Sequence, residues 1–426
     1  MKRDRFYFAK WAFSLFFVAV SARPLWAAAF LAGDCNVDDR VTVEEIVTLV
    51  RLALGEDNAS ACPAADTNQD GAVTIEEIVA AVQTLLAAPP LPQVAFVTAT
   101  DFQTGSFALV GEQPPFPVEP TNPQRRLGAD PVARVFGRRV YVVNRFGGDN
   151  VQVLDAADHF RTLLQCSTGN GSNPQDIAFR SGLQAYIPLL ARAWLLRVNP
   201  HPAADCHDFI VGRIDLQQFA DVDGSPEANQ ATVVGDKLFV TLERLENFAP
   251  VRNGLLLVVD TNTDEVVASM ELAAANPFGM TKGLTVRNGR LFVALVGAFG
   301  ALDGGIEAID TATLVSDGLV ITEAELGGDV TDFVLADDEY GYAVISGPDF
   351  STSLVRFDLK SRSVVTVLSP RDGLSDLELS PRGLLFLTDR NLHRPGVRVL
   401  RATDGAELTP APLFTGLPPF DLVFLP

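Results

Sequence analysis

The sequence contains little cysteine and histidine, and it lacks the short motifs of several large enzyme classes. Only 4 cysteines and 4 histidines occur among 426 residues. No two cysteines are spaced as Cys-x-x-Cys, so neither a zinc ribbon nor a thioredoxin-type redox site has support. There is no Gly-x-Ser-x-Gly elbow, no P-loop and no dinucleotide fingerprint. The enzyme classes built on those motifs therefore lack their minimum parts.

Positive charge is also scarce, with 33 Lys and Arg against 53 Asp and Glu and a net charge of −20. Because like charges repel, this balance argues against nucleic acid or an anionic membrane surface as the main partner. Hydrophobic residues make up 47% of the chain, which excludes wholesale disorder. Acidity alone fits soluble proteins, cation binders and binders of basic substrates equally well.

Long hydrophobic runs are missing outside the N-terminus. There, a basic start precedes an apolar run at 11–20 (WAFSLFFVAV) and a small-residue stretch at 27–29. This order is typical of a cleaved export signal, and we expect residues 1–29 to be a signal peptide. An uncleaved anchor is the alternative, but Arg23 and Pro24 interrupt the stretch before the about 20 apolar residues that a membrane helix needs. The predicted localisation is secreted, periplasmic or cell surface, with no membrane span after signal cleavage.

The four cysteines, Cys35, Cys62, Cys166 and Cys206, agree with export, because an even count in an exported protein favours disulfides. Three pairings are possible. Proximity in the sequence favours Cys35–Cys62 and Cys166–Cys206. The first disulfide would stabilise the fold by about 3–4 kcal/mol.

A tandem repeat at 34–86 is the most informative pattern. The segment DCNVDDRVTVEEIVTLVRLAL begins at Asp34, and DTNQDGAVTIEEIVAAVQTLL begins at Asp66. Each places side-chain oxygens at positions 1, 3, 5 and 12 of a twelve-residue loop and a backbone carbonyl at position 7. Calcium takes six to eight oxygen ligands, which this alternation would supply. The predicted metal ligands are Asp34, Asn36, Asp38, Arg40 (carbonyl) and Glu45 in the first loop, and Asp66, Asn68, Asp70, Ala72 (carbonyl) and Glu77 in the second.

The two loops differ at position 6, where a calcium loop turns sharply. Gly71 permits that turn in the second loop. The first loop has Asp39, which tolerates a left-handed backbone better than most residues, so we expect it to close but to bind calcium more weakly. An acidic turn before an amphipathic helix is the alternative interpretation, but two copies in register disfavour it.

This region resembles a dockerin, the paired loop–helix module related to the EF-hand. The resemblance implies Ca²⁺ as the cofactor and a cohesin-like or cell-surface protein as the partner, since dockerins attach polysaccharide-degrading enzymes to scaffolds. Loop positions 10 and 11 read Val43-Glu44 and Ile75-Glu76 instead of the usual small hydroxyl pair, and position 12 is Glu where Asp is common. Calcium binding therefore carries over better than cohesin binding.

After a proline-rich spacer at 89–92, two types of short strand alternate, such as RRVYVVNR at 138 and VQVLDAAD at 151. Six units of about 40–60 residues match the length of four-stranded propeller blades. The tail PPFDLVFLP at 418–426 predicts the inner strand of a seventh blade, completed by strands from 94 and 105. Joining both ends in one blade removes exposed sheet edges.

We therefore predict a multidomain chain, with a small all-α EF-hand/dockerin-like module followed by an all-β seven-bladed propeller closed by N- and C-terminal strands. The predicted boundaries are a signal peptide at 1–29, the module at 30–88, the linker at 89–92 and the propeller at 93–426. The blade rhythm resembles the YVTN/lactonase-like class of bacterial propellers. An array of β-sandwiches is the structural alternative.

Four acids open the predicted inner strands near one mouth of the central channel: Asp176, Asp332, Asp376 and Asp421. They would either hold a cation or polar ligand, or bond to backbone between blades, as repeat proteins often do. Asn144 and Asn229 are candidates for the Glu/Asn/Asp cluster that metal-dependent propeller lactonases need, but no full set can be assembled and the catalytic residues stay unknown.

The histidines offer one candidate zinc site. His201 and His207 flank Cys206 in the loop HPAADCH. The proline in that loop and the expected disulfide favour a structural role over a metal site.

Two functions from different classes fit these patterns. The preferred hypothesis is a secreted calcium-binding protein whose dockerin-like module displays or attaches a propeller that binds a protein or carbohydrate. The alternative is a secreted polysaccharide-acting or lactonase-type hydrolase, or a lyase, with the module as its anchor. The link to polysaccharide catabolism rests on the dockerin analogy. Acid and amide side chains converging in the channel would favour the enzyme, and a channel lined by Val, Phe and Leu would favour binding.

Overall fold

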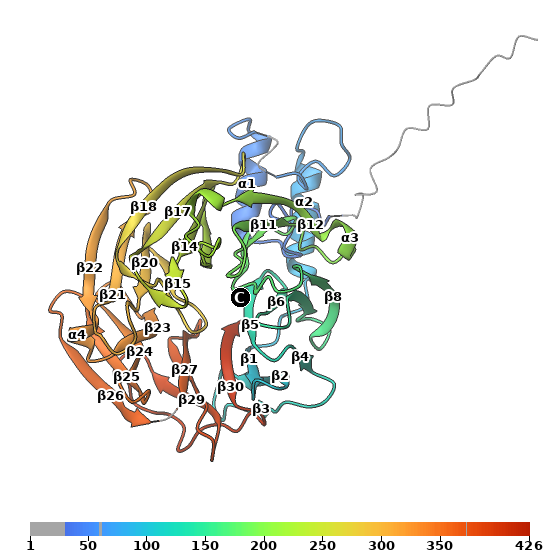
Figure 1. Cartoon of the computed structure of the whole chain (residues 1–426). Coiled ribbons are helices and arrows are strands. Elements are labelled where there is room, and N and C mark those ends of the chain that lie inside the picture. The colour runs from blue at the N-terminus through green and yellow to red at the C-terminus, as the bar shows by residue number, and fades with distance from the viewer. Residues whose placement is uncertain (1–29, 59–61, 372) are drawn as a thin grey trace, which may run out of the picture.

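Antiparallel β-sheets follow one another along the chain and close into a ring of seven blades (Figure 1). The computed structural model describes residues 30–58, 62–371 and 373–426, so the predicted signal peptide at 1–29 lies outside the described residues. Within the described part, no helix is both long and apolar enough to cross a membrane. We number the blades along the chain and give their strands from the channel outward.

The first three blades use the following strands. Blade 1 contains β30 (Pro419–Phe424), β1 (Val94–Thr100), β2 (Gly105–Gly111) and β3 (Val118–Glu119), with β4 (Arg126–Leu127) also paired to β2. Blade 2 contains β5 (Pro131–Phe136), β6 (Arg139–Asn144), β7 (Asn150–Asp155) and β8 (Arg161–Ser167). Blade 3 contains β9 (Ala178–Ser181), β10 (Gln184–Ile187), β11 (Trp194–Val198) and β12 (Ile210–Asp215).

The other blades repeat this order. Blade 4 contains β13 (Ala228–Val234), β14 (Lys237–Leu242), β17 (Asn253–Asp260) and β18 (Glu265–Ala275), with a hairpin of β15 (Leu245–Glu246) and β16 (Ala249–Pro250). Blade 5 contains β19 (Leu284–Arg287), β20 (Arg290–Leu295), β21 (Gly305–Asp310) and β22 (Ser316–Thr322). Blade 6 contains β23 (Asp329–Leu335), β24 (Tyr340–Ser346), β25 (Thr352–Asp358) and β26 (Val364–Arg371). Blade 7 contains β27 (Leu374–Leu379), β28 (Leu384–Asp389) and β29 (Gly396–Arg401).

The ring closes between the two ends of the propeller. β30 pairs antiparallel with β1, and Leu422 lies opposite Val97. The predicted strands at 94, 105 and 418–426 are therefore confirmed as parts of one blade. In Figure 1, β30 lies between β1 and the last blade.

Hydrophobic cores form between neighbouring blades. Successive side chains of a strand point to opposite faces, so each central strand contributes to the cores on both of its sides. Between blades 1 and 2, the rings of Phe96 and Phe107 stack with centroids 4.6 Å apart, and Phe160 lies 5.3 Å from Phe96. This packing gives the connecting loops fixed positions at the two ends of the ring.

Two helices precede the ring, α1 (Val43–Ala53) and α2 (Ile75–Ala87). They pack through Leu49 and Ala81, and each begins with a capping box that uses the Glu at loop position 12. Figure 1 shows them beside the ring near blade 3. Both helices fall within 30–88, while the module predicted there, with its EF-hand or dockerin type, stays a prediction.

Both predicted disulfides are confirmed. Cys35 is bonded to Cys62 in the N-terminal segment, and Cys166 is bonded to Cys206. The second disulfide joins β8 of blade 2 to α3 (Cys206–Phe209) beside blade 3. Among the described residues, the other short helices are η2 (Gln217–Phe219) and α4 (Glu323–Leu326).

Candidate functional site

The two predicted calcium loops share one set of internal hydrogen bonds. The carboxylate of Asp34 accepts from the amides four and five residues later, at 3.0 and 2.9 Å. Asp66 does the same in the second loop, at 3.1 and 2.7 Å. The position-3 amides of Asn36 and Asn68 donate to the position-5 carboxylates at 3.2 and 3.0 Å. Three oxygen-bearing side chains are thus brought together in each loop.

The Glu at position 12 closes each loop onto backbone amides. Glu45 accepts from the amides of Cys35 and Thr42, both at 2.8 Å. Glu77 accepts from the amides of Thr67 and Thr74 at 2.7 and 2.9 Å. At position 7, the amides of Arg40 and Ala72 donate to the position-5 carboxylates at 2.9 and 3.0 Å.

The donor set of these loops is compatible with a hard cation. Each loop offers carboxylate and amide oxygens, which are the ligands that calcium prefers. The backbone is left-handed at position 6 in both loops, with φ of 64° at Asp39 and 91° at Gly71. Burial raises the pKa of Asp34 to about 7, and the carboxylates of Asp38 and Glu45 add repulsion. A cation would relieve this concentration of negative charge.

The four acids of the inner strands tie neighbouring blades together. Each uses one carboxylate oxygen to accept a backbone amide from the next blade. The pairs are Asp176 with Ala231 at 3.0 Å, Asp332 with Leu377 at 2.8 Å, Asp376 with Leu422 at 2.8 Å, and Asp421 with Ala133. The interpretation as backbone ties between blades is therefore confirmed.

In the other three blades, the equivalent position supplies only one further tie. In blade 4 it is Gln230, whose Oε1 accepts the amide of Gly283 at 3.1 Å. In blades 2 and 5 the equivalent residues are Val132 and Lys282, which supply no acceptor. The acids of the blades that follow, Asp176 and Asp332, also accept their own next amides at 2.8 Å. These contacts leave the acids engaged in structure rather than open to a ligand.

A cavity of about 500 Å³ opens where the inner strands end. Arg134 lies there with its Nε 2.7 Å from Asp176 Oδ1, and Lys282 Nζ lies 3.0 Å from Glu378 Oε1. Burial raises the pKa of Asp421 to about 6, against the lowering effect of the Arg134 guanidinium. Apolar and paired charged residues share the lining, so neither the metal cluster nor the purely apolar channel of the sequence analysis is found among the described residues.

Asn144 and Asn229 are not brought together. Asn144 lies in blade 2, where it accepts the amide of Gly128 at 2.7 Å. Asn229 lies in blade 4, where it donates to Glu243. Burial raises the pKa of Glu243 to about 8. The two amides thus form hydrogen bonds in separate blades, and the lactonase-type cluster for which they were candidates is not assembled from them.

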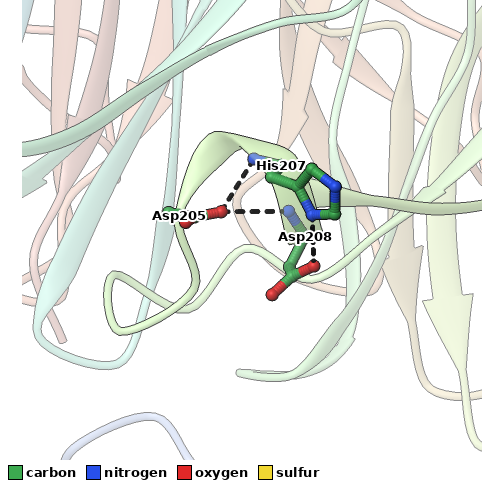
Figure 2. Close-up of side chains that lie close together, drawn as sticks. All are labelled: Asp205, His207 and Asp208. Atoms are coloured by element: carbon green, nitrogen blue, oxygen red, sulfur yellow. Dashed lines mark hydrogen bonds and ion pairs between the residues drawn. The ribbon is translucent and has the colours of Figure 1, made fainter.

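The histidine loop is a helix cap at the surface (Figure 2). The carboxylate of Asp205 accepts from the amides of His207 and Asp208 at 2.8 and 3.3 Å, and thereby caps the four-residue helix α3. His207 Nδ1 lies 2.9 Å from Asp208 Oδ1, and all three residues are exposed. His201 contacts Arg139 instead, with 3.4 Å between His201 Nε2 and Arg139 Nη2. The structural role expected for this loop agrees with these contacts.

Sequence reasoning missed a second cavity, of about 570 Å³, between the loops of blades 2, 3 and 4. Phe146 and Phe248 line this cavity, and their exposed fractions are 78% and 89%. The cavity is lined by loops between the second and third strands of a blade and by segments that link neighbouring blades, whereas the N-terminal loop beginning at Asp34 contacts turns between first and second strands. The cavity therefore opens on the face of the ring opposite to those turns. We call it the upper cavity.

Hydrogen bonds between loops fix the walls of the upper cavity. Asp149 of blade 2 accepts the amides of Gly171 and Asn173 at 2.7 and 2.9 Å. Ser225 Oγ donates to the carbonyl oxygen of Leu190 at 2.7 Å. Glu227 accepts the amide of Leu245 at 2.9 Å. The cavity is thus preformed, as small-molecule sites usually are.

Three acids gather at the rim of the upper cavity. Carboxylate oxygens of Asp221, Asp223 and Glu227 lie within 4.8 Å of one another. Asp221 is paired with Arg252, whose Nη2 is 3.3 Å from Asp221 Oδ2. Burial raises the pKa of Glu227 to about 7, aided by Asp223 and Asp221, while the hydrogen bond from the Leu245 amide lowers it. The available sequence signal was the spacing of acids in DVDGSPE at 221–227.

A scan of protein-family models and a search of curated proteins both found no match. Among solved structures, a candidate 6-phosphogluconolactonase from Bacteroides fragilis superposes with a TM-score of 0.55 at 12% identity, covering 78% of this chain and 98% of that one. Apo AztD from Citrobacter koseri gives 0.49 at 12% identity, covering 78% and 97%. A streptogramin B lyase gives 0.45 at 11%, covering 70% and 91%. At such identities the first likeness supports the propeller fold alone.

Proposed function

We propose that this chain is an exported, calcium-binding protein whose propeller binds an uncharged carbohydrate in the upper cavity. The observation that carries the proposal is the cavity itself, because it combines two exposed phenylalanine rings with hydrogen-bonding oxygens on braced loops. Its place on the face opposite the N-terminal helices allows attachment through one face and ligand binding at the other.

The chemistry of the upper cavity favours a sugar over a protein ligand. A sugar ring presents C–H groups on its faces and hydroxyl donors around its edge, which suit aromatic rings and carboxylate or amide acceptors. Acceptors at the cavity include Asp149, Asn173, Glu227 and Asn247. Acidic sugars are disfavoured, because Asp149, Asp223 and Glu227 would repel them.

Calcium would be held by the two N-terminal loops. Asp34, Asn36 and Asp38 would bind it in the first loop, and Asp66, Asn68 and Asp70 in the second. Glu45 and Glu77, which accept hydrogen bonds from backbone amides, would turn their carboxylates toward the cation. The cation would neutralise the carboxylates and stabilise the folded module. The matched hydrogen bonds and left-handed turns of the two loops support this assignment.

Export and attachment complete the proposal. Two disulfides fit an oxidising compartment such as the periplasm or the cell exterior. On α1 and α2, matched apolar side chains are exposed, among them Val47 and Val79 at 52% and 48%. Paired apolar surfaces of this kind suit a protein partner. The residues at loop positions 10 and 11 lead us to expect weak or no binding to cohesins.

The test uses variants of the upper cavity. Phe248→Ala and Phe146→Ala should weaken binding to soluble neutral polysaccharides by at least about tenfold. Affinity electrophoresis in gels containing β-glucan, xylan or starch, with polygalacturonate as the anionic comparison, measures this. Phe350→Ala is the matched control, since Phe350 is 76% exposed and has a φ of 62° against 63° for Phe248. Equal retardation of all three variants and the parent chain would place the ligand elsewhere.

An enzymatic function is the second candidate, and Glu227 is the observation that favours it. Its pKa of about 7 leaves part of this carboxyl protonated near neutral pH, as in a general acid, and Asp223 lies beside it at the cavity rim. A polysaccharide-acting or lactonase-type hydrolase would then use the same cavity. Release of reducing sugar or titratable acid by the parent chain, abolished in Glu227→Gln, would establish this function.

A further inference from the structure

The first calcium loop is also the surface through which the N-terminal segment contacts the propeller. The amide of Gly182, in the turn between β9 and β10, donates to the carbonyl oxygen of Asn36 at 2.7 Å. The amide of Arg138, in the turn between β5 and β6, donates to the carbonyl oxygen of Asp38 at 3.2 Å. Blades 2 and 3 therefore both bind the backbone of this loop.

Glycine at both turns makes this close approach possible. A Cβ at Gly182 would overlap the carbonyl oxygen of Val37, and a Cβ at Gly137 would overlap that of Asp38. Val37 is only 4% exposed. The loop thus fits into a recess that side chains at either turn would fill.

Arg139 forms the ionic part of this contact. It is 5% exposed, and its Nη2 pairs with Asp39 Oδ2. Asp39 stands at loop position 6, where the second loop has the exposed Gly71. The departure from glycine, which sequence reasoning associated with weaker calcium binding, thus supplies the carboxylate that a buried guanidinium requires.

One segment of backbone therefore serves two purposes. The side chains of Asp34, Asn36 and Asp38 share hydrogen bonds inside the loop, while the carbonyl groups of 36 and 38 accept bonds from the propeller. A cation inside the loop would fix the backbone that the propeller binds. Docking would in turn fix the side chains that the cation needs.

We propose that Arg139 and the two glycine turns position the first loop, so that cation binding there and docking of the N-terminal module on blades 2 and 3 are coupled, whereas the second loop binds its cation independently. This inference rests on the proposed calcium binding. Linkage requires the coupling to be reciprocal, and typical coupling free energies change an affinity by about 5–150-fold.

The test uses the chain 30–426 with Asp66→Ala, which leaves the first loop as the calcium site under study. Adding Gly137→Ala should weaken its calcium affinity at least about tenfold in titration calorimetry. Gly235→Ala is the matched control, because Gly235 occupies the same turn position in blade 4 with a φ of 60° against 58° for Gly137, and no atom lies within 4 Å of its added Cβ. This control should change the affinity less than about twofold.

A second readout separates positioning from stability. Calcium should slow hydrogen exchange at the amide of Gly182 in the parent chain, but not after Arg139→Ala, and Arg139→Lys should restore part of the protection. The coupling is wrong if the parent chain binds two calcium ions but Gly137→Ala and Gly235→Ala leave the first-loop affinity equal, or if calcium never protects Gly182. If the parent chain binds no calcium, the proposed calcium binding fails as well.

Discussion

The loops beginning at Asp34 and Asp66 have matching hydrogen bonds but different surroundings. In the first, Asp34 and Asp38 are 1% and 8% exposed, because the loop lies against blades 2 and 3. In the second, positions 3 to 7 face solvent. The comparison teaches that one local motif, copied along a chain, can serve as a joint between domains in one copy and remain a surface loop in the other.

The residues that differ between the copies follow from these surroundings. At position 2 the first loop has Cys35, which a disulfide ties to Cys62, while the second has Thr67, whose hydroxyl donates to Glu77 at 3.1 Å. At position 6 the first loop has Asp39 for the ion pair with Arg139. Sequence departures from a motif are thus informative where the chain makes a contact that the motif alone does not require.

The largest effect is expected from removing the Cys35–Cys62 disulfide. Cys35→Ser with Cys62→Ser should lower the free energy of unfolding of the N-terminal segment by about 3–4 kcal/mol. It should also weaken the calcium affinity of the first loop more than that of the second. Urea denaturation followed by circular dichroism, together with calorimetry, measures both. Cys166→Ser with Cys206→Ser is the control, which should destabilise the propeller but leave the calcium affinities unchanged. Equal weakening of both loops would show that the disulfide does not distinguish them.

The next effect concerns the first residue of each loop. Asp34→Ala should lower the free energy of unfolding by about 2–4 kcal/mol, because it removes a buried acceptor of two amides and the proposed cation together. Asp66→Ala removes the same two hydrogen bonds from an exposed loop. In the absence of calcium it should therefore lower the free energy of unfolding by about 1 kcal/mol. Thermal denaturation in 1 mM calcium and in chelator measures the difference. If Asp66→Ala lowers the free energy of unfolding as much as Asp34→Ala does, docking contributes nothing to the stability of the first loop.

Exchanging the residues at position 6 sharpens the comparison further. Asp39→Gly restores the usual calcium-loop residue but leaves the buried Arg139 without its carboxylate, so the full chain should lose about 1–2 kcal/mol. Gly71→Asp in the second loop should cost about 1 kcal/mol, because the left-handed backbone at φ of 91° strains a side chain, although the added Cβ meets no atom and Asp tolerates this region better than most residues. Chemical denaturation of the two variants is the measurement. A gain in stability for Asp39→Gly would mean that the ion pair has no role in docking.

The ring could be predicted from the sequence because its signals are local and repeated. Strand pairs recur at blade spacing, and the unpaired inner strand at 418–426 needed partners that only the strands from 94 and 105 supplied. The acids Asp176, Asp332, Asp376 and Asp421 were recognisable for the same reason, since each lies just before an inner strand or in its first four residues. The likeness of the two calcium loops was equally visible, whereas calcium itself remains a prediction.

Two other features could not be predicted from the weak signals that the sequence holds. The upper cavity takes its residues from loops of three blades, so no short window of sequence contains it. The contact between the first loop and the propeller is made largely by backbone carbonyls, which every residue has. Asp39 at position 6 marked that loop as different, but without the position of Arg139 it indicated a weaker calcium site rather than a joint.

The smallest expected effect is the contribution of His201, beside the docked loop, to the pH dependence of stability. Burial and the Arg139 cation lower the pKa of His201 to about 4, below the usual value of about 6.5. The unfolded chain therefore binds a proton at His201 more readily than the folded chain does. Neutral His201 contributes its full stabilisation of the folded state above about pH 6.5, and this contribution is lost as the pH falls towards 4. His201 is half-buried, so we expect about 1 kcal/mol or less. In urea denaturation, the parent chain should lose stability relative to His201→Gln as the pH falls from 7 to 4.5, because only the parent carries this histidine. Because His201 lies against Arg139 and has no counterpart at the exposed second loop, an unchanged pH dependence in this variant would mean that protons do not act on docking through Arg139.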